Sequence, residues 1–330
     1  MIITRSPLRI SLGGGGTDLP SYYNENEGFI LSAAINKYVY VSIIKPFVQG
    51  IFLKYSKFEK VENISEIEHP IIREALRILK IKPQIEITTL ADVPSGTGLG
   101  SSGSFTTALL KALYANVKKN LNPQELAELA CHIEINCLNL SIGKQDQYIS
   151  SIGGLNSFTF HKKNKEKSEV TFKPLNIKNK TMLELEDSLL LFFSGFTRDA
   201  HNILKDQNKR SLENEEDIIN NLHFVKELAL KSKEALESDN IGLFGKLMDQ
   251  HWDHKKKRSN MTSNSQIDKW YNLGKKNGAY GGKLVGAGGG GFLLFVAHNK
   301  TLLRKTMRDE GLNEMRFRFE FEGTKLITDA

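Results

Sequence analysis

Three dense runs of glycine constrain this chain more than any other feature of its sequence. They occupy residues 13–16, 96–103 and 286–291, and the whole chain holds 27 glycines. Glycine costs conformational entropy on folding, so a dense run needs a left-handed backbone or a close approach of the backbone to another group. A tight turn explains any single run equally well. Three such runs favour the approach of backbone to a ligand.

The middle run predicts a site for an anion. A strand-like segment, Ile85–Thr88, precedes it, and a helix is expected to open at Ser101 and Ser102. Free backbone N–H groups and the positive end of the helix dipole would therefore surround one point. A serine hydroxyl there could complete the coordination of a phosphate-bound Mg²⁺, or the two serines could simply cap the helix. The glycines before them favour the phosphate interpretation.

The common nucleotide-binding motifs do not explain this site. The P-loop string G-x-x-x-x-G-K-[ST] does not occur in the chain. Gly96, Gly98 and Gly100 have the wrong spacing for the G-x-G-x-x-G fingerprint of dinucleotide-binding folds. The motif set of the protein kinases is also missing. The anion site therefore needs another explanation.

Two carboxylates after the middle run are candidates for chemistry. Glu134 follows Ala130 by four residues on the helix that is expected to start at Pro123, which puts it at the edge of the buried face. Long carboxylates rarely occupy such positions unless they are paired or bind a metal, although a tolerated boundary position is the alternative. Asp146 lies in a polar cluster after Gly143, where the alternative is a simple turn residue.

Composition narrows the class of protein. The chain has 45 Lys and Arg against 38 Asp and Glu, a net charge of +7 that suits a nucleic-acid binder or an enzyme of phosphate groups. The lysines form no basic stripe interleaved with aromatic residues, so we expect no nucleic-acid partner. No apolar run of about 18 residues and no signal-peptide core occur, and Cys131 and Cys137 are the only cysteines. We therefore expect a cytoplasmic protein without a membrane partner.

Strand and helix patterns alternate along the whole chain, which predicts the α+β class with two domains. Helices are expected over 213–237 and 240–254, and the lysine-rich segment 176–180 is expected to be a loop or a hairpin tip. The alternating phenylalanines of 317–321 predict a strand with one solvated face. The domain boundary should fall within 160–187.

Three segments together resemble the motifs of the GHMP small-molecule kinases, the superfamily of galactokinase, homoserine kinase, mevalonate kinase and phosphomevalonate kinase. Residues 94–102, PSGTGLGSS, are similar to the ATP-phosphate motif P-x-x-x-G-L-G-S-S-A, with Gly103 in place of the usual alanine. Residues 8–18, LRISLGGGGTD, resemble the substrate motif of the sugar kinases. Residues 283–292, KLVGAGGGGF, resemble the third, glycine-rich motif.

Within that superfamily, segments 9–23 and 251–268 look most like the D-glycero-D-manno-heptose 7-phosphate kinases. The resemblance implies the GHMP kinase fold, with an active site between two domains. The N-terminal domain, 1–175, would resemble the second domain of ribosomal protein S5 and bind ATP and substrate. The C-terminal domain, 176–330, would be ferredoxin-like.

The resemblance also implies a role for each matching residue. Asp146 would be the general base, and Arg9 would be the cation that stabilises the moving phosphoryl group. Glu134 and Ser102 would hold Mg²⁺. The nucleotide would bind Pro94, Ser95, Gly96, Thr97, Gly98, Leu99, Gly100, Ser101 and Ser102. The sugar would bind Gly15, Gly16, Thr17 and Asp18, with Gly289 and Gly290 near it.

A phosphosugar also needs cations for its own phosphate group. Arg198, in a short loop after an apolar strand, is the preferred candidate, and the run Lys255, Lys256, Lys257 and Arg258 follows, with Lys256 and Arg258 favoured within it. A solvated helix end is the alternative for this run. The histidines that flank Asp253 mimic a metal cluster, but we expect them on the helix surface.

We therefore expect a sugar-phosphate kinase that uses ATP and Mg²⁺. It would phosphorylate the C1 hydroxyl of D-glycero-D-manno-heptose 7-phosphate to the 1,7-bisphosphate in nucleotide-activated heptose synthesis. The first alternative is an anomeric kinase of an unphosphorylated sugar, such as fucose or another heptose. The second is a non-catalytic regulator that binds sugar and ATP, although a binder needs no base. The sequence leaves monomer and homodimer open.

Overall fold

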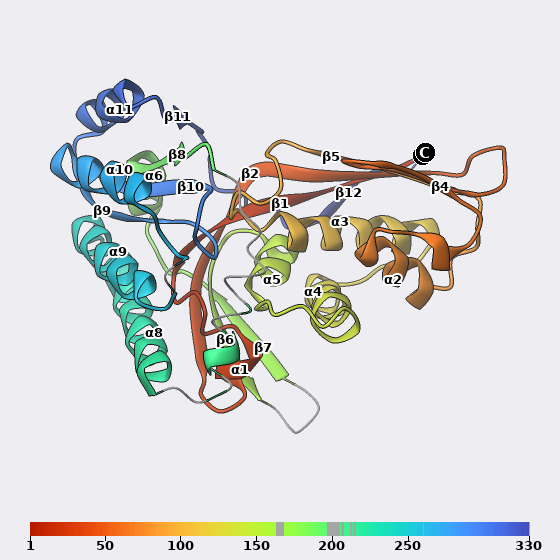
Figure 1. The fold of residues 1–330 in the computed structure, drawn as a ribbon, viewed down its shortest axis with the longest axis horizontal. Coiled ribbons are helices and arrows are strands. Elements are labelled where there is room, and N and C mark those ends of the chain that lie inside the picture. Colours follow the sequence, from red (N-terminus) through yellow and green to blue (C-terminus); the bar gives the residue numbers. More distant parts are fainter. Residues whose placement is uncertain are drawn as a thin grey trace.

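The computed structural model describes residues 1–162, 168–196, 205, 208–211, 213, 216–259 and 261–329 (Figure 1). Its strands are β1 (Ile2–Gly13), β2 (Gly28–Ile44), β3 (Ile51–Lys54), β4 (Phe58–Val61), β5 (Ile85–Ala91), β6 (Leu155–Lys162), β7 (Ser168–Pro174), β8 (Leu189–Phe193), β9 (Ala279–Leu284), β10 (Phe292–Ala297), β11 (Asn313–Glu314) and β12 (Lys325–Asp329). Its helices are α1 (Pro20–Tyr23), α2 (Pro70–Ile78), α3 (Ser101–Asn116), α4 (Pro123–Cys131), α5 (Gln145–Ile152), α6 (Asn179–Ser188), α8 (Glu216–Glu237), α9 (Ile241–Lys256), α10 (Ser265–Lys276) and α11 (Lys300–Asp309), with a 3₁₀ turn η1 (Ile64–Glu66) and a π-helical turn η2 (His132–Cys137).

The larger sheet is built on the long hairpin of β1 and β2. Its strand order is β12-β1-β2-β5-β3-β4, and β6 pairs with β2 and β7. The first part of β2 pairs with β6 and its last part with β5, so one long strand serves two neighbours in turn. Helices α2 to α5 cover one face of this sheet (Figure 1). The loops that join these helices to the sheet therefore gather on that face.

The smaller sheet has the order β11-β8-β10-β9 and is antiparallel. Helix α9 packs on β9, and α8 lies beside α9 and against β1 and β2 (Figure 1). One apolar cluster includes side chains of both sheets, such as Leu12 of β1 and Leu294 of β10. Because the two sheets share a core, the groups between them are held at fixed distances.

The structure confirms the α+β fold class. Helices α8 and α9 are divided at Asn240, and α4 begins with reciprocal capping hydrogen bonds between Asn122 and Glu125. The division of the chain at residue 175 stays a prediction, and β12 adds the last strand of the second half to the first sheet, next to β1. Within the described part of the chain, no helix is both long and apolar enough to cross a membrane.

Two local predictions are wrong. Helix α6 begins at Asn179, inside the expected loop 176–180, because Leu185 of this helix is fully buried and tertiary packing overrides the local lysines. Segment 317–321 forms only an isolated bridge, between Ile35 and Phe319. It fills the gap along β2 between the parts that pair with β6 and β5, which is too short for a regular ladder.

A close contact between α9 and β9 depends on glycine. A Cβ added at Gly281 of β9 would lie 2.2 Å from the carbonyl oxygen of Gly245 in α9. A Cβ added at Gly245 would lie 2.6 Å from the Cβ of Tyr280. Neither position has room for a larger residue, so the helix rests directly on the strand.

We expect Gly281→Ala to lower the free energy of unfolding by about 1–3 kcal/mol, because α9 must move away from β9. Chemical denaturation followed by circular dichroism measures this change. Gly242→Ala is the matched control, since its new Cβ would meet only side-chain atoms of Tyr280, at 3.4 Å or more. Equal stability of the two variants would contradict the close contact.

Candidate active site

All three glycine runs meet at one cavity. It has a volume of about 1070 Å³, and its wall includes Gly15 and Gly16, Gly98 and Gly100, and Gly286. A cavity of this size can hold two small ligands side by side. The runs are at least 80 residues apart in sequence, so the fold brings distant backbone segments to a common space.

The middle glycine run leads into the N-terminus of α3. Gly100 is the N-cap residue in a left-handed conformation with φ 80°, and no side chain caps the helix. Ser101 and Ser102 lie inside the first turn, which removes the capping alternative for them. The first backbone N–H groups of α3 therefore remain available to an anion in the cavity.

Part of the glycine content serves contacts between backbones rather than ligand binding. A Cβ at Gly98 would lie 2.5 Å from the carbonyl oxygen of Val285, and one at Gly291 would lie 2.1 Å from that of Thr97. The second and third runs thus pack directly against each other. Gly289 and Gly290, expected near the substrate, do not line the cavity, and the N–H of Gly289 donates to Thr262.

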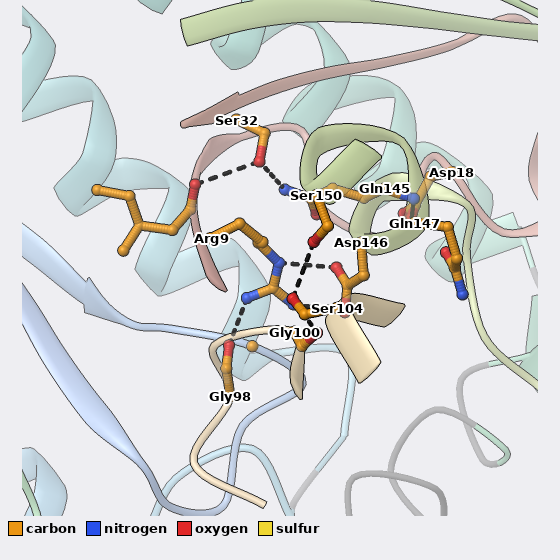
Figure 2. A network of polar contacts seen from close by, with 12 residues as sticks. Arg9, Asp18, Ser32, Gly98, Gly100, Ser104, Gln145, Asp146, Gln147 and Ser150 are labelled. Atoms are coloured by element: carbon orange, nitrogen blue, oxygen red, sulfur yellow. Dashed lines mark hydrogen bonds and ion pairs between the residues drawn. The ribbon is translucent and has the colours of Figure 1, made fainter. Parts of the chain in front are cut away.

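Arg9 and Asp146 form a two-point ion pair in this cavity (Figure 2). Nε of Arg9 lies 2.7 Å from Oδ1 of Asp146, and Nη2 lies 2.9 Å from Oδ2. Nη1 donates to the carbonyl oxygen of Gly98 at 2.5 Å. The arginine side chain is 7% exposed and the aspartate side chain 29%, so the carboxylate faces the open space. One guanidinium thus joins β1, α5 and the glycine loop.

Glu134 and Ser102 form a second polar pair. Glu134 is fully buried in η2, and its carboxylate accepts hydrogen bonds from Oγ of Ser102 at 2.5 Å and from Nε2 of Gln147 at 2.9 Å. Burial raises the pKa of Glu134, against the hydrogen bonds that favour its charged form. The adjacent hydroxyl of Ser101 is buried without a hydrogen-bond partner. Two touching oxygen donors on the cavity wall fit a Mg²⁺ that keeps water and phosphate as its other ligands.

Asp18 follows the first glycine run and brings a carboxylate to the cavity wall. Its carboxylate accepts hydrogen bonds from the N–H groups of Gln145 and Gly16, at 3.1 and 3.2 Å, and lines the cavity. Burial raises the pKa of Asp18, although the N–H of Gln145 favours the charged form. A Cβ at Gly143 would lie 1.8 Å from Oδ2 of Asp18, so only glycine leaves room for this carboxylate.

The structure separates the predicted site residues into two groups. The cavity wall contains Arg9, Gly15, Gly16, Asp18, Pro94, Ser95, Gly96, Gly98, Gly100, Ser101, Ser102, Glu134, Asp146 and Arg258. Thr17, Thr97, Leu99 and Lys256 do not line it. Thr17 instead donates to the backbone of Gly14 and Phe29, and Lys256 lies 3.1 Å from Asp253. Arg198 lies outside the residues that the structure describes.

Sequence reasoning missed two features of the wall. Lys283 and His251 line the cavity beside the candidate cation Lys255, and His251 is buried instead of lying on the helix surface. The helical spacing of 251, 255 and 258 could have indicated that they share one face. An aromatic group, Tyr55, His69 and Phe105, lines another part, and it comes from three separate elements that no local pattern connects.

Known proteins show the same organisation. The family model for the N-terminal domain of GHMP kinases matches residues 58–154, and the model for their C-terminal domain matches residues 232–308. A D-glycero-alpha-D-manno-heptose 7-phosphate kinase of Campylobacter jejuni is 33% identical over 98% of this chain and 98% of its own length.

Two further relatives are more distant. A crystal structure of a D-glycero-D-manno-heptose 1-phosphate kinase from Bacteroides thetaiotaomicron has a TM-score of 0.79 and 27% identity, and the match covers all of both chains. An L-fucokinase/L-fucose-1-P guanylyltransferase of Bacteroides fragilis is 28% identical over 89% of this chain and 34% of its own length. With its two matching domains and its full-length relative, the chain belongs to the GHMP kinases and is a sugar kinase of that family.

Proposed function

We propose that the protein transfers the γ-phosphoryl group of ATP to the C1 hydroxyl of D-glycero-D-manno-heptose 7-phosphate, which gives the 1,7-bisphosphate for nucleotide-activated heptose synthesis. The Arg9–Asp146 pair carries this proposal, because it lies where the glycine loop and the Asp18 loop face one cavity. The 33% identity to a heptose 7-phosphate kinase over the whole chain supports the choice of acceptor.

The pair supplies base and cation together. An oxygen of Asp146 accepts the proton of the C1 hydroxyl while that hydroxyl oxygen bonds to the γ-phosphorus and the bond to ADP breaks. Arg9 holds the carboxylate by two hydrogen bonds and offers positive charge to the moving phosphoryl group. Because Arg9 also donates to Gly98, base and nucleotide loop keep a fixed relative position.

The nucleotide has its own part of the cavity. The open N-terminus of α3 and the loop from Pro94 to Ser102 would receive the triphosphate, and the aromatic group around His69 would contact the base. Burial lowers the pKa of His69, so its ring is neutral and suits stacking. Ser102 and Glu134 would hold Mg²⁺, which neutralises phosphate charge when it is bound.

A second acceptor class has a specific observation in its favour. The matched fucokinase acts, by its name, on a sugar without phosphate, and the matched crystal structure is named as a heptose 1-phosphate kinase. A free sugar and a heptose 1-phosphate are therefore the acceptors to compare with the 7-phosphate. In each case Asp18 would accept hydrogen bonds from sugar hydroxyls.

ADP release with ATP and Mg²⁺ tests the acceptor directly. We expect the highest kcat/KM with D-glycero-D-manno-heptose 7-phosphate, and lower values with its 1-phosphate, free heptose, fucose, mannose and galactose. The new phosphate should be lost in mild acid, because a phosphate on an anomeric oxygen hydrolyses there and a primary phosphate does not. Equal turnover of a free sugar, or an acid-stable new phosphate, would refute the proposal.

Replacement of the base gives the second prediction. We expect Asp146→Asn to lower kcat by about 10²- to 10⁴-fold, because the amide cannot accept the hydroxyl proton. ATP binding should persist, since Asn keeps a hydrogen bond to Arg9. Asp253→Asn, at an exposed position of α9, is the control with the same chemical change. Unchanged turnover by Asp146→Asn would remove this residue as the base.

The space beside Asp18 gives the third prediction. We expect Gly143→Ala to raise the KM of the sugar by about tenfold or more, because the new methyl displaces the Asp18 carboxylate and breaks its bond to Gln145. The KM of ATP should stay the same. Steady-state kinetics with each substrate varied in turn measures both, and Gly242→Ala serves as control. A raised KM for ATP alone would contradict this position for the sugar.

A further inference from the structure

Three buried cations line the cavity without an ion-pair partner. Lys255 ends the buried face of α9, Arg258 follows this helix, and Lys283 lies on β9; their exposed fractions are 9%, 3% and 2%. We call them the cation cluster. Arg9 forms an ion pair with Asp146. In contrast, no side-chain nitrogen of these three residues lies within 4.0 Å of a carboxylate oxygen among the described residues.

Several donors of the cation cluster have no acceptor. Arg258 donates Nε to Asn221 at 2.8 Å and Nη1 to the carbonyl oxygen of Gly15 at 2.6 Å, while its buried Nη2 has no partner. The ammonium group of Lys283 makes no hydrogen bond to any described residue. Both ring nitrogens of the neighbouring His251 are also buried without a partner. Buried donors without acceptors are costly, which indicates that a ligand supplies the acceptors.

The electrostatics of the cavity agree with a missing anion. Burial lowers the pKa of Lys283 to about 7, and Arg9 and Arg258 add repulsion. Burial lowers the pKa of Arg258 to about 10, and the negative charge of Asp18 opposes this shift. Burial and the cationic neighbours lower the pKa of Lys255 well below its usual range. Such a cluster is unfavourable when empty and becomes favourable around a dianion.

We infer that the cation cluster binds the phosphate group that the acceptor sugar already carries, with Lys283 and Nη2 of Arg258 as its direct donors. This inference rests on the proposed phosphosugar acceptor. Arg258 connects the cluster to the sugar side of the cavity, because its Nη1 holds the loop of Gly15 and Gly16 that leads to Asp18. The triphosphate has separate donors at the N-terminus of α3.

Lys255 has a different task within the cluster. Its ammonium group donates to the carbonyl oxygens of Leu284, at 3.0 Å, and Gly286. It thereby fixes the turn that packs on Gly98 and leaves Lys283 and Arg258 to face the ligand. A free sugar would leave these two cations unpaired in a closed space, and a site built for a charged group rejects acceptors that lack it.

Kinetics with two acceptors that differ only in the phosphate separate the roles. We expect Lys283→Met to lower kcat/KM for the 7-phosphate by about 10- to 100-fold, mostly by raising KM. The value of kcat/KM for free heptose should stay the same. Lys246→Met, on the exposed side of the same α9, is the matched control. An equal loss with both acceptors would assign Lys283 to the transferred phosphoryl group and overturn the inference, as would no loss.

Calorimetry without nucleotide tests binding apart from turnover. At pH 8 the wild type should take up about one proton on binding the 7-phosphate, because Lys283, with a pKa of about 7, becomes charged beside the dianion. The groups that face it, Arg9, Arg258, Lys255 and His251, are themselves cationic or neutral. Lys283→Met should lose this uptake, which appears as a dependence of the heat on the ionisation enthalpy of the buffer.

Thermal unfolding shows whether the variant folds. Without ligand, Lys283→Met should melt at a higher temperature than the wild type, because it removes a buried amine whose hydrogen-bonding groups have no partner. Added 7-phosphate should raise the melting temperature of this variant less than that of the wild type. Uptake and affinity that survive the substitution overturn the inference even where the wild type phosphorylates the 7-phosphate. A wild type that phosphorylates only free sugars and binds no 7-phosphate refutes the proposed function, and the inference falls with it.

Discussion

The ion pair between Arg9 and Asp146 determines the geometry on which the rest of the site depends. It joins the first strand of the larger sheet to α5 and, through the carbonyl of Gly98, to the middle glycine run. Groups this close leave no room for side chains on the loop and helix between them. A Cβ at Gly100 would lie 3.0 Å from Cγ of Arg9, and one at Gly103 would lie 2.8 Å from Cβ of Asp146. Gly100 and Gly103 thus leave the space that this charge pair occupies, whatever else the run binds.

This spacing explains the departure of the chain from the usual phosphate motif. The motif commonly has alanine where this chain has Gly103. Helix α5 approaches α3 so closely here that a methyl group would press on the backbone of Asp146 and Gln147. The glycine that looks like a mild departure in the sequence therefore accompanies a close contact of the two helices, and Asp146 lies at this contact.

The sequence predicted the parts of the site that carry a local signal. The glycine runs, the carboxylate of Glu134 at a buried helix edge and Asp146 after Gly143 are such signals, and the family motifs gave them roles. The sequence did not predict positions that depend on which face of a helix its last residues occupy, or on contacts between elements far apart in the chain. The sequence could not separate Lys255 and Arg258, which line the cavity, from Lys256, which does not, because each residue along a helix turns the side chain by about 100°. Lys283 belongs to the third glycine motif, and only the packing of α9 on β9 brings it close to Lys255 and Arg258.

The pairing of β12 with β1 has a consequence for the synthesis of the chain. Residues 325–329 cover the outer edge of β1 from Ile2 to Arg5. A ribosome delivers the N-terminal half first, so β1 waits with one edge open until nearly the whole chain has emerged. Its open edge is then a template for pairing with other strands. A chain that ends before residue 325 therefore keeps this edge exposed, and we expect it to associate with other strands more readily than the full chain.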